Sequence, residues 1–206
     1  MKGRRVVVTG LGAVTPLGNT VAETWPRILA GASGITAVSR FDASGFSVKI
    51  GGDIKGFDPT RFVHIKEVKK MDPFIHYGIA AAAEALQDSG LDLAALNLER
   101  FGVAVGSGIG GLPGIVNGHD AYLQGGPRKI SPFFVPANIV NMVAGQIAIL
   151  HRLRGPNISV VTACTTGTHN IGYAARAIAY GDADFMLAGG AEQALCPMGL
   201  GGFAAA

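Results

Sequence analysis

Cysteine and charged residues are both scarce in this sequence. Its 206 residues include two cysteines, Cys164 and Cys196, and only 15% are charged. Two thiols cannot form a disulfide framework, which excludes the small disulfide-rich secreted class and fits a reducing cytoplasm. The formal net charge is only +3. No long basic run and no basic stretch interleaved with aromatic residues is present, so we expect no nucleic-acid partner.

Long apolar runs are also missing. No stretch reaches the roughly 18 uninterrupted apolar residues of a membrane span. The basic N-terminus leads into valines, but that run ends at Thr9 and Gly10 without a small-residue cleavage site. We therefore interpret it as a first strand and not as a signal peptide. With 49% hydrophobic residues, the chain can bury a sizeable core, and we expect a soluble cytoplasmic protein with no membrane partner.

Strand-like and helix-like segments alternate along the chain. Apolar and β-branched runs predict strands at residues 5–9, 101–106, 158–162 and 185–188. Helical periodicity is clearest at residues 73–89, 136–150 and 168–180. A further helix near residues 20–30 contains Pro26, which should kink or break it. This alternation predicts an α/β layered domain with a largely parallel sheet.

One glycine-rich segment suggests a dinucleotide site. Gly106-Ser-Gly-Ile-Gly-Gly111 follows a predicted strand and matches the G-x-G-x-x-G spacing. A polar segment at residues 118–129, which we expect to be a loop, comes next, and no second strand ends in an acidic residue about 20 positions on. The pattern therefore does not favour nucleotide binding.

Cys164 is the residue most suggestive of chemistry. It follows a β-branched run, stands in a corner of small residues, and precedes an apolar-periodic segment. At such a strand-to-helix turn, the positive end of the helix favours thiolate over thiol, and backbone N–H groups can bind an oxyanion on an attacked carbonyl. The alternative is an inert buried cysteine, because most free cysteines pack as small apolar groups.

The residues around Cys164 form a longer pattern. Gly155, Val160, Ala163-Cys164-Thr-Thr-Gly167 and Ile171 together resemble the active-site pattern of β-ketoacyl synthases, the condensing enzymes of fatty-acid and polyketide assembly. Similarity to the type II enzymes extends over the whole chain. Further matching segments are Arg4-Arg-Val-Val-Val-Thr-Gly-Leu-Gly12, Gly106 to Gly111, Gly126 to Pro136, Asn141 to Gly145, Tyr180 to Asp184 and Ala188 to Glu192.

This resemblance implies a fold and a reaction. The fold is the thiolase-like layered αβαβα architecture, of which residues 1–206 are expected to be the N-terminal half of the duplicated unit. The reaction is a decarboxylative Claisen condensation by a ping-pong route, in which Cys164 accepts an acyl group and malonyl-acyl carrier protein then extends it. The resemblance implies no cofactor and no metal.

The same resemblance assigns roles to other residues. Lys66, Lys69 and Lys70 stand at helical spacing, and the matching lysines of the family dock the acidic helix of acyl carrier protein. From the sequence alone, a solvated helix face is the alternative. Ile109 matches a residue that lines the acyl tunnel, and Phe134 one that reaches the partner's acyl pocket in a homodimer.

A dimer would also cover apolar residues near Phe134. Phe133 and Phe134 stand in a predicted loop, where an apolar pair is costly to leave in water. Packing against the chain's own core is the alternative. We expect Met142 and Val143 to belong to the same interface.

Donors for malonyl decarboxylation are harder to find. The five histidines are His64, His76, His119, His151 and His169. His169 follows Cys164 most closely, but we expect it to point away and to bond locally. The family's catalytic histidines and lysine lie in the second half of the duplicated fold, and the apolar end at Ala206 suggests that the sequence continues. Two alternatives remain: a polyketide-type ketosynthase, or an inactive half chain that only dimerises or binds carrier protein.

Overall fold

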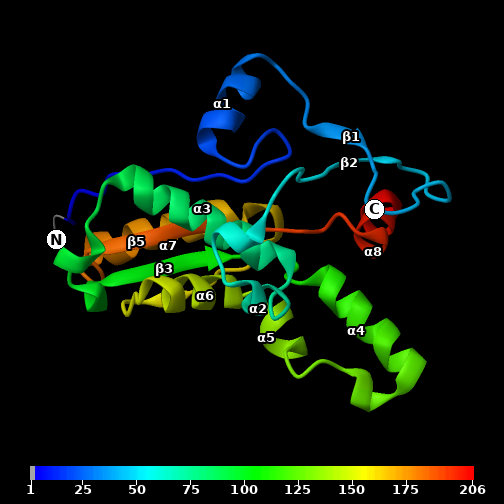
Figure 1. The fold of residues 1–206 in the computed structure, drawn as a ribbon. Coiled ribbons are helices and arrows are strands. Elements are labelled where there is room, and N and C mark those ends of the chain that lie inside the picture. The colour runs from blue at the N-terminus through cyan, green and yellow to red at the C-terminus, as the bar shows by residue number, and fades with distance from the viewer. Residues whose placement is uncertain (1–2) are drawn as a thin grey trace.

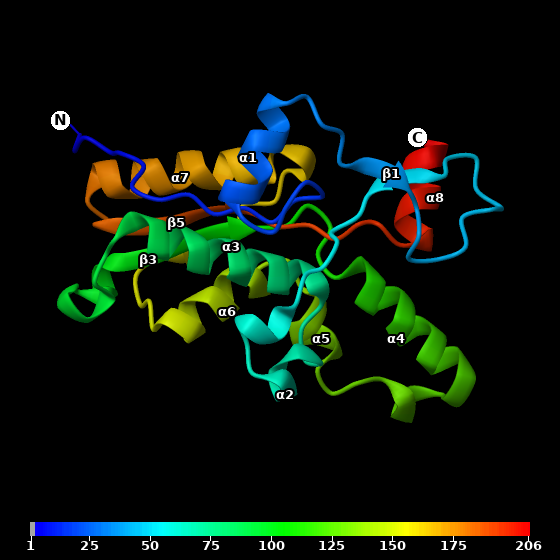
Figure 2. The same ribbon diagram turned by 45° about the horizontal axis from the view of Figure 1, so that its top comes forward.

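A three-stranded parallel sheet forms the centre of the computed structural model, which describes residues 3–206 (Figure 1). The strand order is β4-β3-β5. The strands are β3 (Phe101–Gly106), β4 (Asn157–Ile158) and β5 (Phe185–Gly190), and the flanking helices are α3 (Pro73–Ser89), α6 (Met142–His151) and α7 (Thr166–Tyr180). Helix α7 covers one face and helices α3 and α6 cover the other (Figure 2). This arrangement confirms the predicted α/β layering.

The remaining elements surround this layered body. They are α1 (Val21–Leu29), β1 (Ile35–Ala37), β2 (Ile50–Gly52), α2 (Ile65–Val68), α4 (Leu112–Gly125), α5 (Phe134–Asn138) and α8 (Pro197–Ala205), with the 3₁₀ turns η1 (Pro59–Arg61), η2 (Leu93–Ala95), η3 (Leu98–Arg100), η4 (Pro127–Lys129) and η5 (Ala163–Thr165). Helices α4 and α5 extend away from the sheet as an arm, and α8 lies beside the antiparallel β1–β2 pair (Figures 1 and 2). Within residues 3–206, no helix has the length and hydropathy to cross a membrane.

The core lies between the sheet and helices α3 and α6. All six residues of β3 are buried, and α3 and α6 contribute the largest enclosed side chains. These are Phe74, Ile75, Ile79, Val143 and Ile147. The expectation that Val143 lies at a dimer interface is therefore wrong. Its side chain is fully enclosed and fills the space that a Cβ on Gly78 would need.

Two predicted strands are shorter or absent. Residues 5–9 pair with no strand, since the N-terminal segment instead bonds to helices: Arg4 N–H donates to Ala179 O, and Leu11 N–H donates to the Asp88 carboxylate. In the predicted strand 158–162, only Ile158 lies in the ladder. The backbone of Val160 is bonded by a side chain of α7 and not by a strand.

Three further predictions, for a helix, a loop and a proline, also need correction. The predicted helix 136–150 is two helices, α5 and α6, because Asn138 O accepts a bond from Gly111 N–H and the backbone at Ile139 becomes extended. The expected loop at 118–129 is mostly helix α4. Pro26 lies inside α1 without ending it.

Candidate active site

Cys164 lies in η5, the single turn between the sheet and helix α7, and it is exposed. The residue before it, Ala163, has φ +51°, in the left-handed region. Such a conformation costs a non-glycine residue on the order of 1 kcal/mol. The left-handed conformation of Ala163 turns the chain sharply, and Cys164 follows just ahead of the first turn of α7. The predicted helix after Cys164 is present, but residues 159–162 before the turn are not strand.

A buried amide holds the approach to this turn. Asn170 of α7 is fully enclosed. Its Oδ1 accepts from Val160 N–H at 3.0 Å, and its Nδ2 donates to Val160 O at 2.9 Å and to Thr166 O at 2.8 Å. The side chain thus replaces a strand partner for Val160 and fixes it to the first turn of α7.

Three hydroxyl groups complete the support of the turn. Thr162 N–H donates to Thr166 Oγ1 at 2.9 Å, and Thr165 Oγ1 donates to Thr162 O at 3.0 Å. Thr162 Oγ1 and His169 Nδ1 are 2.7 Å apart. These bonds over-determine the backbone on both sides of Ala163, which is what a strained conformation requires in order to persist.

The glycine-rich loop after β3 lies against the Cys164 turn. A Cβ on Gly108 would stand 3.3 Å from both Cα and O of Ala163, so the two backbones are in close contact. The next residue in the loop is Ile109, the predicted acyl-pocket residue, and its side chain is partly exposed. The structure therefore brings Ile109 and Cys164 to one region.

Acidic side chains occupy the N–H groups that a dinucleotide would need. Glu192 accepts from Ile109 N–H at 3.0 Å, and Asp72 accepts from Gly114 N–H at 2.9 Å, in the first turn of α4. Phosphate binding at a helix start depends on free N–H groups and a positive potential. Here carboxylates take up two of these N–H groups and make the local potential more negative. The site is therefore unsuited to a phosphate, as the sequence pattern also indicated.

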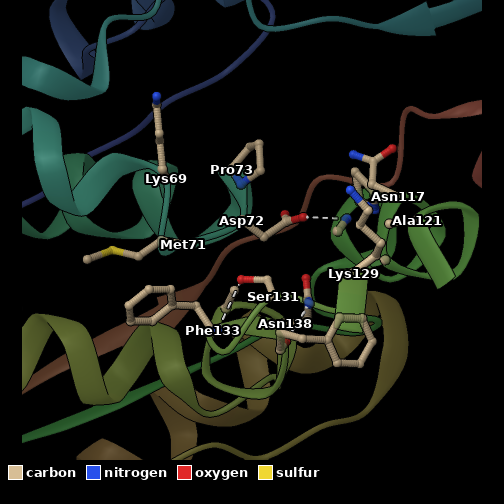
Figure 3. A pocket seen from close by; sticks show the side chains of 15 residues that line it. Lys69, Met71, Asp72, Pro73, Asn117, Ala121, Lys129, Ser131, Phe133 and Asn138 are labelled. Atoms are coloured by element: carbon tan, nitrogen blue, oxygen red, sulfur yellow. Dashed lines mark hydrogen bonds between the residues drawn. The ribbon is translucent and has the colours of Figure 1, made fainter. Parts of the chain in front are cut away.

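A separate pocket of about 380 Å³ lies between the start of α3 and the arm (Figure 3). Lys69, Asp72, Phe134 and Asn138 are among its lining residues. Burial raises the pKa of the Asp72 carboxyl to about 6, and the negative charge of Glu192 adds to the rise, against the two backbone N–H bonds that lower it.

Of the other predicted residues, Lys69 and Phe134 line this pocket, whereas Lys66, Lys70, Ile109 and Cys164 do not. Phe134 packs where a Cβ on Gly118 would stand, 2.5 Å from the ring, so the chain's own arm partly covers it. Phe133 remains exposed. Its ring centroid is 5.2 Å from Lys70 Nζ.

The three lysines do not lie on one helix. Helix α2 is a single turn that ends at Val68, and Lys69 and Lys70 follow it. Lys70 Nζ is 2.7 Å from Glu67 Oε1, so its charge is partly neutralised. Lys66 and Lys69 are exposed. The predicted shared helical face is therefore replaced by a basic corner between α2 and α3.

Two histidines make local contacts. The expected local bond of His169 is confirmed, but its partner is Thr162 in the turn that carries Cys164, so its ring does not point away from that turn as expected. The buried His76 lies 3.2 Å from Val68 O. Burial lowers the pKa of His76. Within residues 3–206, no group of three or more His, Cys, Asp or Glu side chains is arranged to hold a metal ion.

Two supporting contacts were not predicted from the sequence: the bonds of Asn170 to Val160, and the bond that Ser107 Oγ donates to Glu192 Oε1 at 2.8 Å. Ser107 and Glu192 follow β3 and β5 respectively, and neighbouring parallel strands end at one edge of a sheet. That rule could have placed the two side chains together. Nothing in the spacing of Asn170 indicated a bond to Val160.

Comparison with known proteins agrees with this geometry. Residues 3–206 match the family model described as the N-terminal domain of β-ketoacyl synthases. The chain is 58% identical over 206 residues to the 3-oxoacyl-(acyl-carrier-protein) synthase 2 of Vibrio cholerae, covering all of this chain and 50% of that protein. The corresponding enzyme of Coxiella burnetii is 54% identical over 205 residues, with 100% and 50% coverage. This chain thus spans about half the length of these relatives.

Solved structures show the same fold. The ishigamide ketosynthase/chain length factor has a TM-score of 0.88 at 30% identity, covering 98% of this chain and 51% of that chain. A ketosynthase of a type II polyketide synthase, in complex with its acyl carrier protein, has a TM-score of 0.81 at 28% identity, covering 97% and 53%. With a family model matched across residues 3–206, the chain belongs to the β-ketoacyl synthase family, in which it corresponds to the N-terminal domain.

Proposed function

We propose that this chain is the N-terminal, nucleophile-bearing half of a β-ketoacyl-acyl carrier protein synthase that elongates fatty acids in the cytoplasm. The observation that carries the proposal is the exposed Cys164 on a strained turn directly before α7. Identity of 54–58% to 3-oxoacyl-(acyl-carrier-protein) synthase 2 enzymes supports the fatty-acid reaction. The polyketide ketosynthases are more distant, at 28–30% identity.

The first half-reaction uses groups present in this chain. The Cys164 sulfur attacks the carbonyl of an acyl-carrier thioester, the tetrahedral oxyanion collapses, and the carrier's thiol leaves with a proton. Backbone N–H groups near the start of α7 would stabilise the oxyanion. In the second half-reaction, malonyl-carrier protein loses carbon dioxide and the resulting carbanion displaces Cys164 from the acyl group. We propose that its polarising donors lie in the other half of the synthase.

Acyl carrier protein would bind at the basic corner. Lys66 and Lys69 are exposed and Lys70 lies beside them, which suits an acidic partner helix. The structurally similar ketosynthase seen with its acyl carrier protein supports this kind of partner.

A homodimer and an acyl pocket complete the proposal. Phe133 is exposed and Phe134 is only partly covered by the arm, which leaves apolar surface for a second copy. Ile109 would line the acyl pocket from the loop beside Cys164.

Mass spectrometry of the full-length protein tests the proposal. After incubation with acyl-carrier protein, we expect one acyl group on the peptide that contains Cys164, and none in Cys164→Ala. Cys196→Ala is the matched control, because Cys196 is the other free thiol and is buried; this variant should be acylated like the wild type. Acylation of Cys196, or of neither cysteine, would refute the assignment.

A further inference from the structure

Glu192 uses both carboxylate oxygens to hold the loop after β3. It lies just past the end of β5. Its Oε1 accepts from Ser107 Oγ at 2.8 Å, and its Oε2 accepts from Ile109 N–H at 3.0 Å. Hydrogen bonds to an ionised acceptor are the stronger kind. An exposed carboxylate that makes two such bonds to one loop fixes the position of that loop.

Ser107 extends this support by one residue. Its side chain is buried, and its Oγ accepts from Gly110 N–H at 2.9 Å while it donates to Glu192. The carboxylate therefore acts on Ile109 directly and on Gly110 through a hydroxyl. Glu192 and Ser107 together thus fix the backbone at Ile109 and Gly110.

The loop at residues 107–110 lies between Glu192 and the turn that carries Cys164. A Cβ on Gly108 would be 2.9 Å from Glu192 Oε2 and 3.3 Å from Ala163 Cα. Carboxylate, loop and turn are thus in successive contact. A shift of the loop would move Ile109 and would remove the surface on which Ala163 rests.

We propose that Glu192 is a positioning residue for acyl transfer to Cys164. It holds residues 107–110 so that Ile109 and the turn at Ala163 keep the geometry that an incoming acyl chain needs. Glu192 acts through the loop and takes no part in bond making. This inference rests on the proposed role of Cys164 as acyl acceptor.

Two substitutions in the full-length protein separate position from charge. Glu192→Gln keeps a carbonyl for Ile109 N–H and offers an N–H to Ser107 Oγ, whereas Glu192→Ala keeps neither. We expect the maximal rate of Cys164 acylation to fall about tenfold in Glu192→Ala, with the KM for acyl-carrier protein changed less than about twofold. Glu192→Gln should recover most of the rate. Ser107→Ala, which removes the bonds to Glu192 Oε1 and to Gly110 N–H but leaves the bond from Ile109 N–H to Glu192, should lose less.

Amide hydrogen exchange gives a readout that does not depend on activity. In the wild type, the Ile109 amide should be protected by its bond to Glu192. It should exchange faster in Glu192→Ala and slowly again in Glu192→Gln. The Val103 amide, which donates to Pro156 O within the sheet, should stay protected in all variants. Glu99→Ala, an exposed carboxylate elsewhere, is the matched control and should change neither measurement.

The outcomes distinguish the two claims. If wild type is acylated at Cys164 but Glu192→Ala acylates at the same rate, or Ile109 exchange is unchanged, the inference about Glu192 is wrong and the proposed function stands. A failure of Glu192→Gln to recover the rate would also overturn it, since charge and not position would then matter. If the wild type takes no acyl group on Cys164, the proposed function fails and this inference fails with it.

Discussion

Asp72 Oδ2 accepts a hydrogen bond from the backbone N–H of Gly114 at 2.9 Å, across the boundary between the core and the arm. Its Oδ1 accepts from Phe74 N–H at 3.3 Å, so one carboxylate caps the first turns of both α3 and α4. The backbone N–H of Asp72 also donates to Ala137 O in α5. Asp72 therefore bonds the start of α3 to both helices of the arm, α4 and α5.

The raised pKa of Asp72 predicts an unusual pH dependence. Because burial raises its pKa from 3.8 to about 6, the native protein binds this proton more tightly than the unfolded chain does. Asp72 should therefore lower the free energy of unfolding as pH rises from about 4 to about 6. Asp72→Asn should lack that component, which urea unfolding across this range measures.

The control for this experiment is Asp92→Asn. Asp92 caps the short turn η2 by accepting from Ala94 N–H and is exposed. Its substitution removes an exposed capping carboxylate and so controls for the loss of a cap. Parallel profiles for Asp72→Asn and wild type would show that the Asp72 carboxyl titrates as it does in the unfolded chain.

Asn170 should be costly to replace. Asn170→Ala leaves Val160 N–H and O without their partners in a partly buried setting, and we expect a loss of about 2 kcal/mol in the free energy of unfolding. Asn170→Asp should be at least as damaging, because a carboxylate would face Val160 O and Thr166 O. Asn97→Ala, which removes the exposed cap of η3, should cost about 1 kcal/mol. Equal losses at the two positions would contradict the role of Asn170.

Two glycine-to-alanine substitutions should change the stability of the protein in opposite directions. A Cβ at Gly106 would stand 2.7 Å from Val160 O and 2.9 Å from Asn170 Nδ2, so Gly106→Ala should destabilise the protein by about 2 kcal/mol. Gly172 lies on the exposed side of α7 with nothing within 4 Å of a Cβ. Gly172→Ala should therefore stabilise the helix by about 0.5–1 kcal/mol. Thermal unfolding of both variants checks the pair, and a stabilising Gly106→Ala would refute the close contact.

The basic corner predicts a salt-sensitive substrate interaction. Replacing Lys66 and Lys69 by Glu should raise the KM for carrier-protein substrates about tenfold at low ionic strength and should flatten its salt dependence. Replacing Lys49 and Lys55, two exposed lysines on either side of β2, by Glu changes the net charge by the same amount and should have little effect. An unchanged KM in the Lys66 and Lys69 variant would make these lysines part of an ordinary solvated surface.

The sequence predicted those elements whose signals are local. Helix α3 has the expected bounds because Asp72, Pro73 and Gly90 specify its start and end. Helix α4 was missed because Gly114, Gly118 and Gly125 weaken its helical signal. The first two glycines are needed because Asn138 and Phe134 approach closely there, and that packing depends on residues far along the chain.

The candidate site could likewise be predicted only where its signals are local in the sequence. The turn at Cys164 could be located because the β-branched run, the small corner and the helix are consecutive in the sequence. The support of this turn could not, because Asn170 acts on Val160 through a side chain that takes the place of a strand. The link from Glu192 to Ser107 joins the ends of two strands and appears only when β3 and β5 are paired.

The central position of β3 affects how the protein folds. Both of its neighbours, β4 and β5, come much later in the sequence, so a ribosome makes the fully buried strand well before either partner. Before β4 emerges, α3 and α6 are the flanking helices available to cover it, and α7 is made only after β4. Contacts this distant in sequence slow folding and leave apolar strand edges exposed during synthesis. The nascent chain should therefore be most dependent on chaperones between the synthesis of β3 and that of β5.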